Sequence, residues 1–110
     1  MSLLLSWFYL LLAIITEVIG TTSMKLAEGF SRLWPSILVF VMYAISLVFM
    51  TLALKRIEIS VVYAVWSGLG TALITLIGFL AFREPMTALK IGSIALIVIG
   101  VIGLNLTGSH

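Results

Sequence analysis

The sequence contains no cysteine and a single histidine, which stands at position 110. This shortage excludes a disulfide framework, a metal site built from Cys and His, and a thiol nucleophile. Charge is scarce as well, since 9% of the residues are charged, whereas ordinary globular chains carry roughly a quarter. So few charges cannot cover the surface of a soluble domain. We therefore expect the chain to lie in lipid.

The cations are few and scattered, which bears on possible partners. Six Lys and Arg residues stand against four acids, giving a formal charge of +2 and a pI near 9.3. A nucleic-acid surface needs a dense basic stripe, and the sequence has none. No nucleophile pairs with a base, and no glycine-rich phosphate loop is present. We expect no nucleic-acid partner, no cofactor and no enzymatic activity.

Long apolar runs dominate what remains, with 63% hydrophobic residues and a mean hydropathy of +1.33. About 20 apolar residues cross a bilayer as a helix, and backbone groups in lipid must pair within the segment. The sequence predicts an all-α integral protein of the cell membrane, a single four-helix domain over residues 1–110. Its transmembrane spans are expected at about 3–24, 35–54, 59–82 and 86–106.

The charged connections decide orientation only weakly. Lys25, Arg32, Arg83 and Lys90 fall on one side of the membrane. Lys55 and Arg56 fall on the other side, together with the N-terminal amine. Because orientation follows the excess of Lys and Arg in short loops, this small bias permits both insertions.

Glu17 is the acid that stands apart from the connections, two-thirds of the way along the first span. An ionisable group inside a membrane costs on the order of 3 kcal/mol by insertion scales. One interpretation is a protonated Glu that hydrogen-bonds to a neighbouring helix and only holds the helices together. The other is a site that binds protons and cations, and we favour it.

Helical spacing surrounds Glu17 with small and hydroxylated residues, because positions three, four and seven apart share a face. On the first span these are Leu10, Ala13, Gly20 and Thr21. A stripe on the third span contains Tyr63, Trp66 and Ser67, and Tyr43 of the second span could add a further ring. Such a stripe can serve packing alone. Beside a carboxylate, aromatic rings suit an organic cation.

Small residues in the third and fourth spans predict bending and helix contact. Gly68 and Gly70 lower helix propensity in mid-span, where we expect a hinge. A stripe of the fourth span lets a partner helix approach and is the predicted dimer interface; it consists of Ser93, Leu96, Ile97, Gly100 and Val101. Four helices are too few to enclose a drug-sized substrate. An antiparallel homodimer would supply the inverted second half that larger transporters contain as a repeat.

Three stretches resemble the small multidrug resistance family. They are TEVIGTTSMK from Thr16 to Lys25, EGFSRLWPS from Glu28 to Ser36, and AVWSGLG from Ala64 to Gly70 with Tyr63 before it. The resemblance covers nearly the whole chain. It implies a proton-coupled exporter of lipophilic cations that works as an antiparallel dimer of dual topology.

By position, the resemblance assigns the essential carboxylate to Glu17 and the helix kink to Gly68 and Gly70. It assigns the pocket to Ala13, Gly20, Thr21, Tyr43, Tyr63, Trp66 and Ser67. The GTT after Val18 and Ile19 is similar to the branch that exports quaternary ammonium compounds. The chain departs from the family pattern at Ser93, where Gly is usual, and at Trp7, where Tyr is expected.

The mechanism expected from these residues is competition between protons and cation for Glu17 of both subunits. Two alternatives stay open: an exporter of guanidinium or polyamines on the same scaffold, and an accessory membrane subunit that transports nothing by itself. A heteromer with a paralogue is a further alternative to the homodimer. Membrane lipid, lipophilic organic cations and protons are the expected partners.

Overall fold

The computed structural model describes residues 2–108, and within that range it contains four α-helices and no strand. The helices are α1 (Leu3–Leu26), α2 (Leu33–Ala53), α3 (Ile59–Phe82) and α4 (Ala88–Gly108). Each is long and apolar enough to cross a membrane. The predicted spans are confirmed as helices, and the protein is an all-α, multi-pass membrane protein.

Local chemistry explains where the helices begin and end relative to the predicted spans. α1 continues past Lys25, whose charge favours the negative end of the helix dipole. α2 begins at Leu33, which leaves Pro35 within the first turn, where its missing N–H has no acceptor to lose. α4 begins at Ala88 rather than near residue 86, because the Thr87 hydroxyl caps it by accepting from the Lys90 N–H at 3.1 Å.

A left-handed residue ends α3 and sets the path of the next connection. Arg83 has φ of 56°, and the N–H of Glu84 donates back to the Gly78 carbonyl at 3.0 Å. This turn lays the Glu84 carboxylate over Gly78 and within 3.2 Å of Lys25 Nζ at the end of α1. Both side chains are roughly half exposed, so the ion pair ties these two ends together without much stabilisation.

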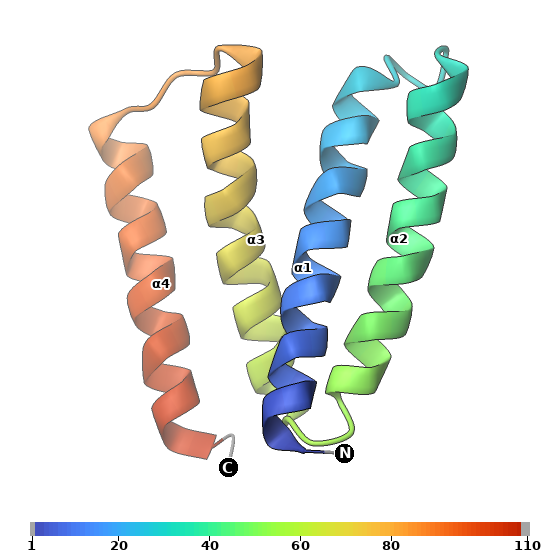
Figure 1. Ribbon diagram of the computed structural model, residues 1–110. Coiled ribbons are helices and arrows are strands. Elements are labelled where there is room, and N and C mark those ends of the chain that lie inside the picture. Colours follow the sequence, from blue (N-terminus) through green and yellow to red (C-terminus); the bar gives the residue numbers. More distant parts are fainter. Residues whose placement is uncertain (1, 109–110) are drawn as a thin grey trace.

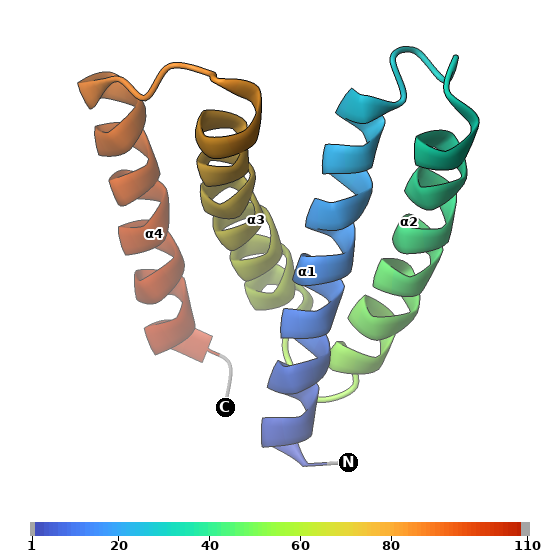
Figure 2. The same cartoon turned by 45° about the horizontal axis from the view of Figure 1, so that its top comes forward.

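The helices lie side by side in the order α2, α1, α3, α4 (Figures 1 and 2). The Cα atoms extend over 43 × 34 × 16 Å. A width of this size fits four helices in a row at the usual spacing of about 8–10 Å. The array is therefore a curved layer in which α1 and α3 are the central helices, and its faces are not closed by a second layer.

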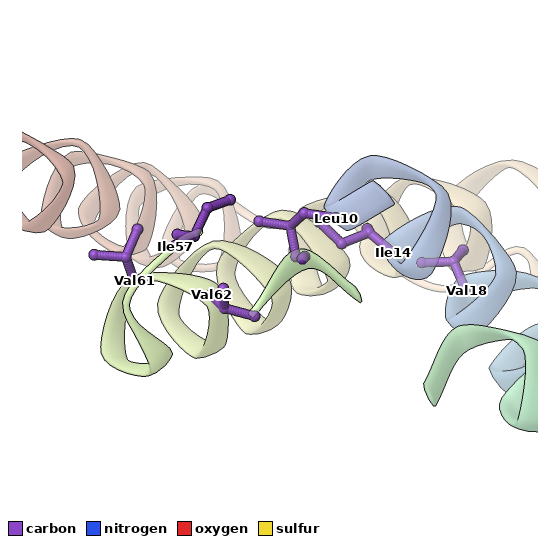
Figure 3. Packing of buried hydrophobic residues seen from close by; sticks show 7 residues of the cluster. Leu10, Ile14, Val18, Ile57, Val61 and Val62 are labelled. Carbon is purple, nitrogen blue, oxygen red and sulfur yellow. The ribbon is translucent and has the colours of Figure 1, made fainter. Parts of the chain in front are cut away.

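The core lies where α1 crosses α3 and the connection that precedes it. Leu10, Ile14 and Val18 of α1 pack with Val61 and Val62 of α3, and Ala53 and Ile57 complete the cluster (Figure 3). All seven residues are buried. From this crossing α1 and α3 diverge toward the end of the molecule that carries the α1–α2 and α3–α4 connections (Figure 1). The divergence leaves space between the two central helices beyond Val18.

α4 packs on α3, and Gly68 of α3 is one point of this contact. A Cβ atom at Gly68 would lie 2.7 Å from Val101 Cγ2 and 3.1 Å from Ile97 Cγ2. These two side chains therefore pack on α3 of their own chain. Ser93, Leu96 and Gly100 lie on the exposed surface of α4. The predicted dimer interface stays a prediction, and in this chain Ile97 and Val101 already have an intramolecular partner.

We predict that Gly68→Ala destabilises the fold because the added methyl group must displace Val101. Overpacking of this kind costs about 1–3 kcal/mol. The measurement is thermal or denaturant unfolding of the purified protein in detergent, followed by circular dichroism. Gly92→Ala is the matched control, since a Cβ at Gly92 meets nothing within 4 Å. Equal stability of the two variants would contradict the packing of α4 described here.

Candidate functional site

Glu17 lies on α1 between the core residues Ile14 and Val18, and its side chain is partly buried. Thr21, one turn further along α1, donates its hydroxyl hydrogen to Glu17 Oε1 at 2.7 Å. Lys25, the next cation along the helix, is paired with Glu84 instead. The carboxylate is therefore held by a neutral hydrogen bond and not by a neighbouring cation.

The hydroxyl of Tyr43 on α2 extends this hydrogen bond into a chain of three groups. Tyr43 OH lies 2.7 Å from Thr21 Oγ1. A threonine hydroxyl has one hydrogen, and Thr21 gives it to Glu17. Tyr43 must then be the donor to Thr21. The order Tyr43, Thr21, Glu17 runs from α2 to α1 and polarises each hydroxyl toward the carboxylate.

Gly20 makes this chain of hydroxyls possible. A Cβ at Gly20 would lie 2.6 Å from Cδ1 and 2.7 Å from Cε1 of Tyr43. With hydrogen at this position, the tyrosine ring lies directly against the backbone of α1. The Tyr43 hydroxyl then reaches Thr21. Gly20 is thus a structural requirement of the site, a role that the sequence pattern marked only as a small neighbour of Glu17.

The second oxygen of the carboxylate faces α3. A Cβ built at Gly70 would lie 3.6 Å from Glu17 Oε2, so the bare backbone of Gly70 leaves the space beside this oxygen open. α3 is continuous from Ile59 to Phe82. Gly70 thus lies beside the carboxylate, and Gly68 lies against α4. The role of the two glycines as a hinge remains a prediction.

Two cavities border Glu17 and share Trp66. The first, about 220 Å³, is here called the hydroxyl cavity; its lining is Glu17, Thr21, Trp66, Ser67, Gly70, Thr71 and Ile74. The second, about 380 Å³, is here called the aromatic cavity; its lining is Glu17, Tyr43, Ser46, Leu47, Met50, Tyr63 and Trp66. Glu17 thus lies between a cavity that Thr21, Ser67 and Thr71 line with hydroxyl groups and a more apolar cavity.

The aromatic rings of α3 form an edge-to-face pair. The ring centroids of Tyr63 and Trp66 lie 5.6 Å apart with an interplanar angle of 65°. Tyr63 is 63% exposed, so much of its side chain is accessible. Trp66 is partly buried, and its Nε1 is shielded and without a hydrogen-bond partner among the described residues. Together the rings offer negative π faces within the same cavity as the carboxylate.

The structure brings most of the predicted pocket together but places Leu10 and Ala13 elsewhere. Leu10 is 1% exposed and packs in the α1–α3 core. Ala13 is fully buried against α2, where its carbonyl accepts from the Ser46 hydroxyl at 2.7 Å. Neither residue lines a cavity that Glu17 borders. Both lie on the Glu17 face of α1, but α3 covers Leu10 and α2 covers Ala13.

Sequence reasoning missed four residues that line the two cavities: Ser46, Leu47, Met50 and Thr71. In each case helical spacing places the residue on the same helix face as a residue that was predicted to line the pocket. Leu47 and Met50 follow Tyr43 at intervals of four and seven residues, which places them on its helix face. Thr71 follows Ser67 by one turn. What the sequence did not supply was the rotation of α2 and α3 about their own axes.

A third cavity of about 360 Å³ lies between the diverging ends of α1 and α3. Thr21 borders it as well as the hydroxyl cavity. Its far end contains Glu84 and Lys25, whose Nζ lies 5.7 Å from the centroid of the Phe82 ring. This space connects the neighbourhood of Glu17 with the end of the array that carries the ion pair.

Four apolar helices around a partly buried carboxylate define a multi-pass membrane protein with an acidic site inside its membrane-spanning part. The chain belongs to the small multidrug resistance protein family, whose sequence model matches residues 5–97. The resemblance stated from the sequence motifs is therefore confirmed.

Individual relatives agree with this family. The chain is 54% identical to the uncharacterized membrane protein YvaE of Bacillus subtilis, over 93% of this chain and 86% of the relative. It is 45% identical to the quaternary ammonium compound-resistance protein QacE of Escherichia coli, over 91% of each chain. It is 42% identical to the quaternary ammonium compound-resistance protein QacG of a Staphylococcus species, over 94% of this chain and 98% of the relative.

We predict that Thr21→Val weakens the binding of tetraphenylphosphonium about tenfold. The variant removes a hydrogen-bond donor to the carboxylate, and hydrogen bonds to charged groups contribute about 1.5–3 kcal/mol. Titration of the purified protein with tetraphenylphosphonium measures the change in affinity.

Thr22→Val is the matched control for this experiment. The Thr22 hydroxyl donates to the Val18 carbonyl of its own helix at 2.8 Å and does not contact Glu17. It should bind as the wild type does. If Thr21→Val also kept the wild-type affinity, the hydrogen bond to Glu17 would have no part in binding.

Proposed function

We propose that this protein is a proton-coupled antiporter that exports lipophilic and quaternary ammonium cations, and that protons and substrate compete for Glu17. The observation that carries the proposal is the environment of the carboxylate. Oε1 is held by Thr21, while Oε2 is open beside Gly70. Glu17 borders two cavities; Trp66 lines both, and Tyr63 lines the aromatic cavity. A carboxylate arranged in this way can take up a proton or neutralise an organic cation.

The relatives support the class of substrate. Two of them are named for resistance to quaternary ammonium compounds, and a further one, EbrB of Bacillus subtilis, is named a multidrug resistance protein at 42% identity. A quaternary ammonium ion has no N–H group and binds through charge and aromatic contact. The aromatic cavity, with Tyr43, Tyr63 and Trp66 around one carboxylate, has the chemistry that such an ion requires.

Competition at one carboxylate is sufficient for coupling. Burial disfavours a charge that is not balanced, so Glu17 is stable when it holds either a proton or a cation and costly when it holds neither. If the protein changes its facing side only when the site is filled, a proton gradient drives the cation outward. This coupling needs no nucleotide.

The chain of hydroxyls gives the two states of Glu17 different hydrogen-bond directions. With the carboxylate charged, Tyr43 donates to Thr21 and Thr21 donates to Oε1. A proton on Oε1 would reverse both donations without moving a heavy atom, because each hydroxyl hydrogen can rotate. Tyr43 and Thr21 can therefore keep Glu17 hydrogen-bonded both when it holds a proton and when it is charged and faces a cation.

We also propose that the working unit is a dimer with antiparallel subunits. The array is one layer of helices, and on the side where the Glu17 cavities open, this chain encloses them only partly. A second chain facing this side would enclose the substrate and bring a second Glu17 to the site. The exposed surface of α4, with Ser93, Leu96 and Gly100, offers a contact of small and apolar residues to such a partner. A paralogue could take the place of the second copy.

We predict that Glu17→Gln abolishes proton-driven transport while the protein still inserts and folds. The amide has nearly the same shape but can neither ionise nor balance a cation. Glu17→Asp keeps the charge on a shorter side chain, so transport should persist with a shifted pH dependence. The measurement is tetraphenylphosphonium transport by purified protein in liposomes under an imposed pH gradient, with a pH-sensitive dye inside.

Glu28→Gln is the control, because Glu28 lies exposed in the α1–α2 connection. It should transport as the wild type does. Transport by Glu17→Gln against a gradient would remove the basis of the proposal. Failure of the wild type to transport any cation would favour the accessory-subunit interpretation instead.

A further inference from the structure

The hydroxyl groups on the α3 side of the hydroxyl cavity offer hydrogen-bond acceptors to it, because their own hydrogens are already donated to backbone carbonyls. Ser67 gives its hydroxyl hydrogen to the Tyr63 carbonyl at 2.7 Å, and Thr71 gives its own to the Ser67 carbonyl at 2.6 Å. Each hydroxyl has one hydrogen to give. Both oxygens, which lie on the exposed side of α3, therefore offer only lone pairs to the cavity.

The remaining polar groups of this cavity have the same character. Thr21 donates its hydroxyl hydrogen to Glu17 Oε1, and Glu17 Oε2 is open beside Gly70. Among the residues that line this cavity, only Trp66 has a side-chain N–H group, and its Nε1 is shielded from solvent. Acceptors on α3 thus stand beside one carboxylate oxygen from α1, and the complementary ligand is a cation that has its own N–H groups.

The size of the cavity limits that ligand to a head group. Drug-sized ligands occupy cavities of about 300–1,000 Å³, and this one measures about 220 Å³. A quaternary ammonium head would fill it without donating to any acceptor, and each acceptor deprived of water and left unpaired is costly. A primary ammonium head of similar charge donates three hydrogens.

We propose that Ser67 and Thr71 form a subsite for the head group of protonated primary amines, distinct from the aromatic cavity that takes quaternary ammonium ions. This inference rests on the proposed function, because both subsites use the charge of Glu17. Trp66 and Glu17 border both cavities. The same carboxylate is thereby shared by two classes of cation, and Thr71 determines specificity for the class that carries N–H groups.

The test uses two probes that differ only in their head groups, benzylammonium and benzyltrimethylammonium. At about pH 7 the amine is protonated, as a lysine side chain is. Binding to the purified protein is measured by titration calorimetry. We expect Thr71→Val, which is nearly isosteric, to weaken benzylammonium binding five- to tenfold and to leave benzyltrimethylammonium within twofold. Thr71→Ser, which keeps the hydroxyl, should restore benzylammonium binding.

Thr75→Val is the matched control. Thr75 lies one turn further along α3 and bonds to its own helix in the same way, at 2.7 Å from the Thr71 carbonyl, but it does not line the hydroxyl cavity. It should change neither affinity. Tyr63→Leu should have the opposite selectivity and weaken benzyltrimethylammonium more, because Tyr63 lines only the aromatic cavity of the two.

Ser67→Ala provides an independent test of the subsite should Thr71→Val fold poorly, and it should weaken benzylammonium selectively. Equal loss of both probes in the Thr71 and Ser67 variants would overturn the subsite. So would a wild-type protein that binds benzyltrimethylammonium but not benzylammonium, while the proposed function would stand. Binding of neither probe to the wild type would instead count against the proposed function itself.

Discussion

The structure depends on holding one carboxylate inside the membrane-spanning part of the chain without a cation beside it. Glu17 receives one hydrogen bond from Thr21, which is itself supported by Tyr43, while Lys25 is engaged with Glu84. A single hydrogen bond keeps the side chain in place but does not balance its charge. In the proposed function, an external positive charge, either a proton or an organic cation, balances the charge of this carboxylate.

Glycine residues determine the surroundings of the Glu17 carboxylate. At Gly20 a methyl group would strike the Tyr43 ring, and at Gly70 the missing side chain leaves Glu17 Oε2 open. Gly68 fulfils a different role, since it lets Val101 and Ile97 of α4 approach α3. The glycines thus determine both which hydrogen bonds Glu17 can make and which of its oxygens a ligand can reach. The hydroxyl-bearing side chains then give the space on the α3 side a different chemistry from the aromatic space.

The sequence predicts the four helices well because lipid permits few alternatives: an apolar run of that length must pair its backbone groups internally. It also identifies Glu17 with Thr21, Tyr43, Tyr63, Trp66 and Ser67, since an acid within an apolar run and helical spacing are both visible in the sequence. The errors concern rotation and crossing. Leu10 shares the Glu17 face of α1 yet packs against α3. Leu47, Met50 and Thr71 line the cavities because α2 and α3 turn those faces toward Glu17. The rotation of each helix follows from contacts between helices, such as Gly20 with Tyr43, and the spacing of residues in the sequence does not predict such contacts.

The central claim is that one carboxylate exchanges protons for cations, and its most direct test is to count protons when a cation binds. Tetraphenylphosphonium is added to the purified wild-type protein in weakly buffered detergent, and the change in pH is recorded at several starting pH values. The account predicts that protons are released into solution as the cation binds. Saturable binding without proton release at any starting pH would contradict it.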